Sequence, residues 1–421
     1  MRYNGGEWRC RTQDELSCYP QELKENAGSE NGVLKLSAQT VSIFPCRSYE
    51  QETVERAVRK VLEDCGGLGA ALARDARVLI KPNMLAPEPA ERVVTTHPAV
   101  VRAVVKAVQE VGGTAFVGDS PMEGPLMRVA EISGIMDVVR ETGASLLELE
   151  ENIEVEVPGA RLCRFIKLSA AAMEMDMVIN VAKLKTHTLT GLTAAVKNCY
   201  GFIGGRQKKL YHLRYPMVDD FANFLLDLYL ATRPAISIVD AVVAMEGLGP
   251  RHGRPEPVGA ILASTDAVAL DAVSAQLVGF VPAEVSTLDA AIRRQMIGGN
   301  LADINVLGPF EELRHLDFDR GAAGKGWSFL LRYAPAWIRN IQEGRRPWPC
   351  INEKCTGCGR CLEYCPVEAM FMSEVENGKK RRRASIMYDA CLRCYCCLEI
   401  CPEGAVSLKR RKTPSSGIDR I

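Results

Sequence analysis

Two runs of four cysteines repeat the same spacing between residues 355 and 401. Each run reads Cys-x2-Cys-x2-Cys-x3-Cys-Pro. Thiolates at this spacing hold [4Fe–4S] clusters, because short loops bring three sulfurs of a run onto one cluster while the fourth reaches the other cluster. The predicted ligands of one cluster are Cys355, Cys358, Cys361 and Cys401, and those of the second are Cys391, Cys394, Cys397 and Cys365. The pattern predicts electron transfer.

The composition describes an ordinary globular protein. The 421 residues are enough for two or three domains, with 47% hydrophobic and 25% charged residues. No apolar run reaches the roughly 18 residues that span a bilayer, and residues 1–19 lack the apolar region of a secretory signal, so we expect neither a membrane span nor a secretory signal. Thiolate ligands require reduced cysteines, which favours a cytoplasmic, reducing and anaerobic setting.

The charge balance argues against a nucleic-acid partner. Lys and Arg together number 52, and so do Asp and Glu, which gives a formal net charge of zero. Two basic runs, 379–383 and 409–412, are open to two interpretations. They are either a nucleic-acid patch or solvated basic edges around an anionic cofactor, and we favour the second.

The segment 39–320 alternates short apolar runs with longer helical patterns. The expected strands are 41–44, 77–80, 114–118, 177–181, 236–240 and 259–263. The expected helices are 50–64, 97–111, 125–142, 217–231, 265–278 and 283–295. Nearly continuous apolar strands indicate burial on both faces. The predicted fold class is therefore α/β, with a largely parallel sheet and helices on both faces, plus a small C-terminal α+β ferredoxin domain.

The expected domain boundaries follow from these patterns. They are a flexible or lightly packed lead-in at 1–38, an α/β domain at 39–320, a linker or strap helix at 321–349, a ferredoxin domain at 350–408 and a basic tail at 409–421. The linker shows an apolar helical stripe interrupted by Pro335. Such a helix either lies on a membrane surface or straps the two domains together, and we favour the strap.

Five of the predicted strands end in charged or Gly/Pro-rich segments. These segments are 81–83, 118–121, 183–187, 240–250 and 264–266. In open α/β sheets, ligands bind outside the carboxyl ends of the strands. The sequence therefore predicts one shared crevice.

The residues expected at this crevice make it cationic, so that it would hold a carboxylate or phosphate together with helix N-termini. The catalytic candidates are Lys183, Lys185 and His187, with His187 as the preferred proton donor. The candidates for binding a ligand or cofactor are Lys81, Asp119, Lys197, Lys208 and His212. The alternative is that these polar loop residues are exposed to solvent and have no role in binding or catalysis. The glycine-rich stretch 201–206 lacks a nucleotide-binding signature and reads as a loop that closes over the site.

Several of these segments together resemble the signature blocks of the DUF362 family. They are Lys81-Pro82-Asn83, Gly118-Asp119-Ser120-Pro121, Lys183-Leu184-Lys185-Thr186-His187, Val196-Lys197-Asn198, Asp240-Ala241, Glu246-Gly247-x-Gly249-Pro250 and Asp266-x-Val268-Ala269-Leu270-Asp271. The segment 391–397 is similar to the second cluster run of members that end in a ferredoxin domain. The resemblance covers roughly residues 40–405 and implies a DUF362 domain fused to a bacterial-type 2[4Fe–4S] ferredoxin. It implies no particular reaction.

The leading hypothesis is a ferredoxin-linked oxidoreductase that uses two [4Fe–4S] clusters and a redox partner protein, and acts on an anionic small molecule in the crevice. Two alternatives stay open. One is a non-catalytic electron carrier or redox adaptor, and the other is a maturation scaffold that hands on a metal or a cluster.

Overall fold

The computed structural model describes residues 2–4, 7–9, 39–69, 72–205, 207–298, 301–321, 346–376 and 380–409. The chain divides into two compact units, Met1–Gln39 and Thr40–Ile421. In the first unit, β1 (Arg2–Asn4) pairs antiparallel with β2 (Glu7–Arg9). The rest of the predicted lead-in, most of the predicted strap helix and nearly all of the predicted basic tail lie outside the described residues.

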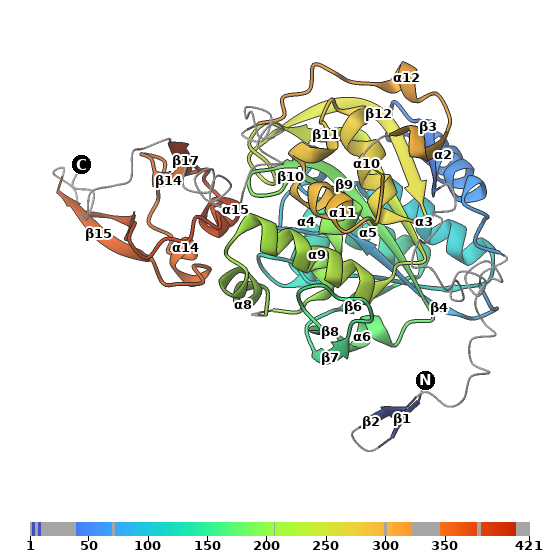
Figure 1. Cartoon of the computed structure of the whole chain (residues 1–421), viewed down its shortest axis with the longest axis horizontal. Helices are drawn as coiled ribbons and strands as arrows, with labels where there is room; N and C mark the ends of the chain where they lie inside the picture. Colours follow the sequence, from blue (N-terminus) through green and yellow to red (C-terminus); the bar gives the residue numbers. More distant parts are fainter. Residues whose placement is uncertain are drawn as a thin grey trace. The chain divides into compact units, whose positions relative to one another are not determined.

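A nine-stranded mixed sheet forms the centre of the second unit (Figure 1). Its strands are β3 (Gln39–Pro45), β4 (Arg77–Pro82), β5 (Thr114–Asp119), β6 (Ser145–Glu148), β9 (Met177–His187), β10 (Gly191–Thr193), β11 (Ile236–Glu246), β12 (Arg254–Ser264) and β13 (Ile304–Leu307). The order is β13-β3-β12-β11-β9-β4-β5-β6, with β10 paired to β9. The run from β11 to β6 is parallel, whereas β12 is antiparallel to both its neighbours. The predicted largely parallel sheet is confirmed.

Helices and apolar clusters cover both faces of this sheet. One cluster includes residues of α2 (Gln51–Asp64), α3 (Pro98–Glu110), α4 (Leu126–Ser133) and α5 (Ile135–Thr142). The other includes residues of α9 (Val218–Thr232), α10 (Ala267–Leu277) and α11 (Ser286–Arg293). Neighbouring strand residues alternate between the clusters: Leu79 packs in one and Ile80 in the other. This two-sided burial explains the nearly continuous apolar strands.

Shorter elements complete the large domain. They are η2 (Ala90–Arg92), the antiparallel pair β7 (Asn152–Glu156) and β8 (Phe165–Ser169), α6 (Ala170–Met173), α7 (Ala195–Asn198), η3 (Cys199–Phe202), α8 (Gln207–Arg214), η4 (Pro282–Glu284), η5 (Leu301–Asp303) and α12 (Phe310–Leu313).

Local expectations differ from the structure in several places, and one of them is β11, which extends beyond the expected 236–240 to Glu246. The single helix expected at 125–142 is two helices, because Gly134 adopts a positive φ of 79° that ends α4. Strand β9 extends to His187, so the segment 183–187 belongs to the strand and does not follow it. The segment 264–266 lies at the opposite edge of the sheet from the crevice, because Ser264 of the antiparallel β12 pairs with Ser237 near the start of β11.

The C-terminal part has the predicted small α+β architecture. Strand β14 (Trp348–Ile351) pairs with β17 (Val406–Lys409), and β15 (Met370–Glu376) pairs with β16 (Lys380–Ile386). Two short helices, α14 (Arg360–Glu363) and α15 (Cys396–Ile400), lie between these pairs in the chain. Within the described ranges, no helix combines the length and the apolar character needed to cross a membrane.

Candidate functional site

A cavity of about 60 Å³ lies at the carboxyl ends of the parallel strands β4, β5 and β9. The parallel pairing explains this convergence, since it brings the three strand ends to one edge of the sheet. Helices α7 and α8 supply further walls. Of the eight large-domain residues predicted from the sequence, seven line this cavity: Lys81, Asp119, Lys185, His187, Lys197, Lys208 and His212.

A buried ion pair joins the ends of two strands at the cavity wall. Lys81 Nζ lies 2.9 Å from Asp119 Oδ1, and both side chains are almost fully buried. The other carboxylate oxygen of Asp119 accepts a hydrogen bond of 2.7 Å from the amide of Met84. Because each charge has a partner, the pair is held rigidly without a net charge of its own.

Asn198, which the sequence analysis did not select, is the hydrogen-bonding centre of the wall. Its Oδ1 accepts from Lys81 Nζ at 3.3 Å and from Asn83 Nδ2 at 3.1 Å. Its Nδ2 donates to Asn180 Oδ1 at 2.8 Å. The sequence signal that could have indicated Asn198 was its place beside Lys197 in the segment 196–198, which resembles a signature block of the DUF362 family.

Asp271 of α10 fixes the start of α7, which carries Lys197 and Asn198. Its carboxylate accepts hydrogen bonds from the amides of Ala195 at 2.6 Å and Val196 at 3.1 Å. Burial raises the pKa of Asp271 to about 7, although these two amides oppose the shift. Asp271 therefore positions the cationic helix without touching the cavity.

Lys185 is the cavity group whose charge changes near neutral pH. Burial, followed by the positive charges of Lys197 and Lys183, lowers the pKa of Lys185 to about 7. Its Nζ donates to Asn83 Oδ1 at 2.6 Å and to the carbonyl of Val94 at 2.9 Å. A buried lysine with such a pKa suits proton transfer.

His187 presents an N–H group to the cavity. Its Nδ1 accepts the amide N–H of Leu189 at 3.1 Å, so the proton of the neutral ring is assigned to Nε2. Burial and the nearby lysines hold the pKa of His187 well below its usual value, which keeps the ring neutral. Nε2 lies 3.4 Å from Oε1 of Glu399, a residue of α15.

Glu399 brings the C-terminal domain into the cavity wall. This carboxylate is 6% exposed and lies in the chain between Cys397 and Cys401. Burial raises the pKa of Glu399, and Lys197 and Lys185 oppose that shift. Sequence reasoning missed Glu399, because its position within a cysteine run gave no indication that it would reach another domain.

The remaining cations differ in how they are held. Lys197 Nζ lies over the rings of Tyr200 at 4.6 Å and Phe221 at 5.9 Å. Among the described residues, Lys197 has no ion pair and no hydrogen bond from its ammonium. Lys208 donates to Ser120 Oγ at 2.8 Å, and burial lowers the pKa of Lys208 to about 8. Lys197 is therefore the cation most available to a ligand.

His212 is a neutral, stacked wall residue. Its ring lies 4.4 Å from that of Phe221 at an interplanar angle of 22°. Burial, assisted by the charge of Lys197, lowers the pKa of His212 to about 3. At neutral pH this histidine adds no charge to the cavity.

Lys183 does not line the cavity, unlike the other selected residues. Its Nζ lies 2.8 Å from Asp240 Oδ2 and 2.7 Å from the hydroxyl of Tyr49. The pairing of β9 with β11 is irregular between Lys183 and Lys185, which separates the surroundings of the two lysines. Lys183 takes part in a separate, fully buried ion pair.

Several of the cysteine thiols predicted to bind clusters lie close enough to shift one another's pKa. Cys355, Cys358 and Cys401 are the thiol neighbours of Cys361 that raise its pKa, after the larger effect of burial. Cys394 and Cys365 are the corresponding neighbours of Cys391, and burial is again the largest cause. The closing cysteines Cys365 and Cys401 each accept an amide N–H at 3.2 Å, from Ala369 and Ala405 respectively.

The two runs also share one backbone conformation. Gly357 and Gly359 have positive φ in the first run, and Arg393 and Tyr395 have positive φ at the equivalent positions of the second. A side chain rarely adopts this conformation unless the surrounding structure requires it. In the described segments, no three His, Cys, Asp or Glu converge closely enough for a single metal ion. A four-iron cluster needs a wider cage, and two sets of thiols with amide donors to sulfur fit that group.

Arg251 connects the cavity side of the large domain to α15. Its guanidinium donates to Glu88 Oε1 at 3.0 and 2.7 Å and to the carbonyl of Ile400 at 3.1 Å. It also pairs with Glu123, which in turn pairs with Arg360 of α14. This buried network holds the cysteine-bearing helices against the large domain.

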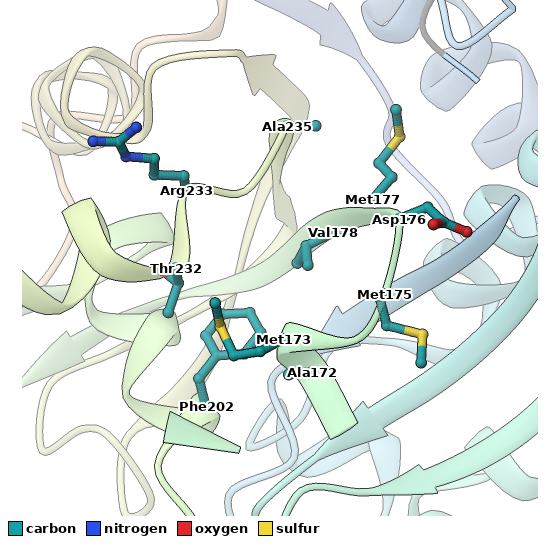
Figure 2. Close-up of a pocket in the computed structure, with 10 residues that line it drawn as sticks. All are labelled: Ala172, Met173, Met175, Asp176, Met177, Val178, Phe202, Thr232, Arg233 and Ala235. Atoms are coloured by element: carbon teal, nitrogen blue, oxygen red, sulfur yellow. The ribbon is translucent and has the colours of Figure 1, made fainter. Parts of the chain in front are cut away.

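A second cavity of about 170 Å³ lies at the opposite edge of the sheet, at the amino ends of β9 and β11 (Figure 2). Met173, Met175, Met177 and Phe202 line it. Its Asp176 accepts a hydrogen bond from the amide of Arg77. This lining lacks the converging titratable groups of the smaller cavity, which we therefore take as the functional site.

Comparison with known proteins connects both parts of the chain to families. Residues 78–276 match the family described as "Domain of unknown function (DUF362)", and residues 354–405 match the "4Fe-4S dicluster domain". The thylakoid-associated protein sll1697 of Synechocystis sp. (strain ATCC 27184 / PCC 6803 / Kazusa) is 34% identical over 287 residues, which cover 66% of this chain and 86% of that protein. The lactate racemase apoprotein of Thermoanaerobacterium thermosaccharolyticum matches with a TM-score of 0.39 and 13% identity, over 58% of each chain.

Proposed function

Since this chain belongs to the DUF362 family and ends in a 4Fe–4S dicluster domain, we propose that it is an oxidoreductase that exchanges electrons with a small anion in the 60 Å³ cavity. One observation carries this proposal. The cavity is walled by the cationic strand ends and also by Glu399, which the chain places between two predicted cluster ligands. A site for an anion and a route for electrons therefore meet at one place.

Two [4Fe–4S] clusters occupy the two cysteine sets in this proposal, and when bound they supply or accept single electrons. Cys358 is exposed, whereas the other three cysteines of its predicted set are buried. Cys396, next to the predicted ligand Cys397, lies close enough to Lys197 and Tyr200 to influence the pKa of each. A redox partner protein accordingly approaches at Cys358, and electrons reach the cavity by way of the segment around Cys396.

The chain's own groups bind the anion and move the proton. Lys197 attracts the anion, supported by the positive end of the Lys81–Asp119 pair. His187 Nε2–H orients the anion by donating a hydrogen bond. The sequence analysis selected His187 as proton donor, but its neutral ring makes Lys185, with a pKa of about 7, the better group for that step.

We further propose a reducing, cytoplasmic and anaerobic setting, and no nucleic-acid partner. Cluster thiolates require reduced cysteines, and the formal net charge of zero supplies no electrostatic attraction to phosphate backbones.

The first test uses full-length protein purified without oxygen. About eight iron and eight sulfide per chain are expected, with EPR signals of two interacting clusters after reduction by dithionite. Cys394→Ser should remove or convert one cluster. Retention of about eight irons in that variant would contradict the ligand assignment.

The second test addresses the cavity. Acetate should bind the reduced protein, change the EPR spectrum and bind much less tightly to Lys185→Met. The matched control is Lys167→Met, because Lys167 is exposed and lies on β8, away from the cavity. Equal acetate affinity in both variants would contradict the assignment of this cavity as the anion-binding site. Anion binding without any cluster reoxidation by a panel of small acids would favour the electron carrier.

A further inference from the structure

The cavity contains a buried acceptor that lacks a donor. Oε1 of Glu399 has no hydrogen-bond partner among the described residues. His187 Nε2 lies 3.4 Å away, but this contact does not have hydrogen-bond geometry. Leaving a buried polar atom unsatisfied is unfavourable, so such an atom at a cavity wall marks a place where a ligand supplies the donor.

The cavity also contains a group with the opposite requirement. Lys197 is a cation without an ion-pair partner in the described part of the chain, and Lys81 and Lys208 line the same cavity. A ligand that satisfies both Lys197 and Glu399 carries an anionic group for the lysine and a hydrogen-bond donor for the glutamate. Acetate or another plain carboxylate satisfies only the first requirement.

The group on the ligand that donates a hydrogen bond to Glu399 is expected to be neutral, because the cavity is lined by lysines. Lys185 and Lys197 line the same cavity as Glu399, and they would repel a ligand ammonium. A hydroxyl group donates one hydrogen bond and brings no charge. The small cavity, about 60 Å³, further restricts the ligand to a few non-hydrogen atoms.

We infer that the cavity selects small carboxylates that bear a hydroxyl group, and that Glu399 is the residue that recognises this hydroxyl. The inference rests on the proposed function, because it takes the cavity to be an anion site. It adds that the ferredoxin domain contributes a specificity residue to the site of the DUF362 domain. The site is then complete only while α15 is docked.

The experiment compares two acids that differ by one hydroxyl. Binding of glycolate and acetate to the full-length, cluster-loaded protein is measured by anaerobic calorimetry. The additional hydrogen bond from the ligand hydroxyl to Glu399 predicts at least a roughly tenfold tighter binding of glycolate. In Glu399→Leu this ratio should fall to about one, and in Glu399→Gln it should take an intermediate value because the amide keeps an oxygen that accepts a hydrogen bond.

Two controls separate the possible failures. Glu403→Gln alters an exposed carboxylate near the same cysteine run and should preserve the ratio. Iron and sulfide content is measured for every variant, and if Glu399→Leu loses a cluster, Glu399→Gln decides the question. Equal binding of the two acids by the parent protein overturns the hydroxyl selectivity, and an unchanged ratio in both Glu399 variants overturns the assignment of Glu399. Failure of both acids to bind the parent overturns the anion cavity itself.

Discussion

The most direct structural test of domain docking is Arg251→Met, which removes the guanidinium and keeps a long apolar side chain. The Arg251 side chain is 3% exposed and connects Glu88 and Glu123 to the end of α15. Removing one partner of a buried ion pair costs about 3–5 kcal/mol, because the remaining charge is left without compensation.

The structure places this variant at the lower end of that range. Glu123 keeps a second partner in Arg360, and the side chain of Glu88 is 20% exposed, so that water can solvate it. We therefore expect a loss of about 3 kcal/mol. At about 1.4 kcal/mol for each factor of ten, the interface should open roughly 100-fold more often.

Hydrogen exchange measured by mass spectrometry under anaerobic conditions reports this opening. Peptides from 246–254 and 396–405 should exchange faster in Arg251→Met, while iron content stays unchanged. The matched control is Arg254→Met in the same segment, because Arg254 is 66% exposed and pairs with Glu246 and Asp319 of the large domain. If both variants exchange at the same rate in 396–405, the Arg251 network does not hold the domains together.

Three further predictions concern the cavity. Acetate affinity should fall as pH rises through about 7, because the Lys185 ammonium loses its proton there. The free energy of unfolding should rise with pH between about 7 and 10.5, the ordinary pKa of a lysine, because in this range only the unfolded chain keeps the proton of Lys185. Gly201→Ala should lower acetate affinity, measured by titration, at least roughly tenfold, while EPR shows the clusters intact. The reason is that a Cβ at this position would lie 1.9 Å from Asp119 Oδ1 and 2.6 Å from Lys81 Nζ. Asp271→Ala should cost about 2 kcal/mol in denaturant unfolding, since two buried amides lose their acceptor, and it should weaken acetate binding as well.

The outcomes that would contradict these predictions are equally specific. A pH-independent affinity between pH 6 and 8 would mean that Lys185 does not titrate in the site. Gly69→Ala is the control for Gly201→Ala, since a Cβ at Gly69 meets only Val111 at an ordinary 3.8 Å, and both variants binding alike would contradict the close packing at Gly201. An Asp271→Ala protein as stable as the parent would show that the start of α7 does not depend on this carboxylate.

Local patterns were sufficient for most of the secondary structure and for much of the cavity. Apolar runs placed the strands that carry Lys81, Asp119 and Lys185 at or near their carboxyl ends, because burial on both faces leaves a continuous signal in the sequence. The parallel-sheet rule then brought these ends together. The direction of β12 was not readable, since its apolar run has the same composition in either orientation, and the segment 264–266 was therefore assigned to the wrong edge.

The sequence by itself determined the two cysteine runs, the strands and the cationic character of the strand ends, because spacing, burial and charge are local properties of the chain. The tertiary structure decided which charges meet. It paired Lys183 with Asp240 away from the cavity, brought Glu399 from a cysteine run 212 positions beyond His187 to within 3.4 Å of that ring, and joined Arg251 to the end of α15. These contacts join residues far apart in the chain, so only the pairing of the strands and the packing of one domain on the other fix them.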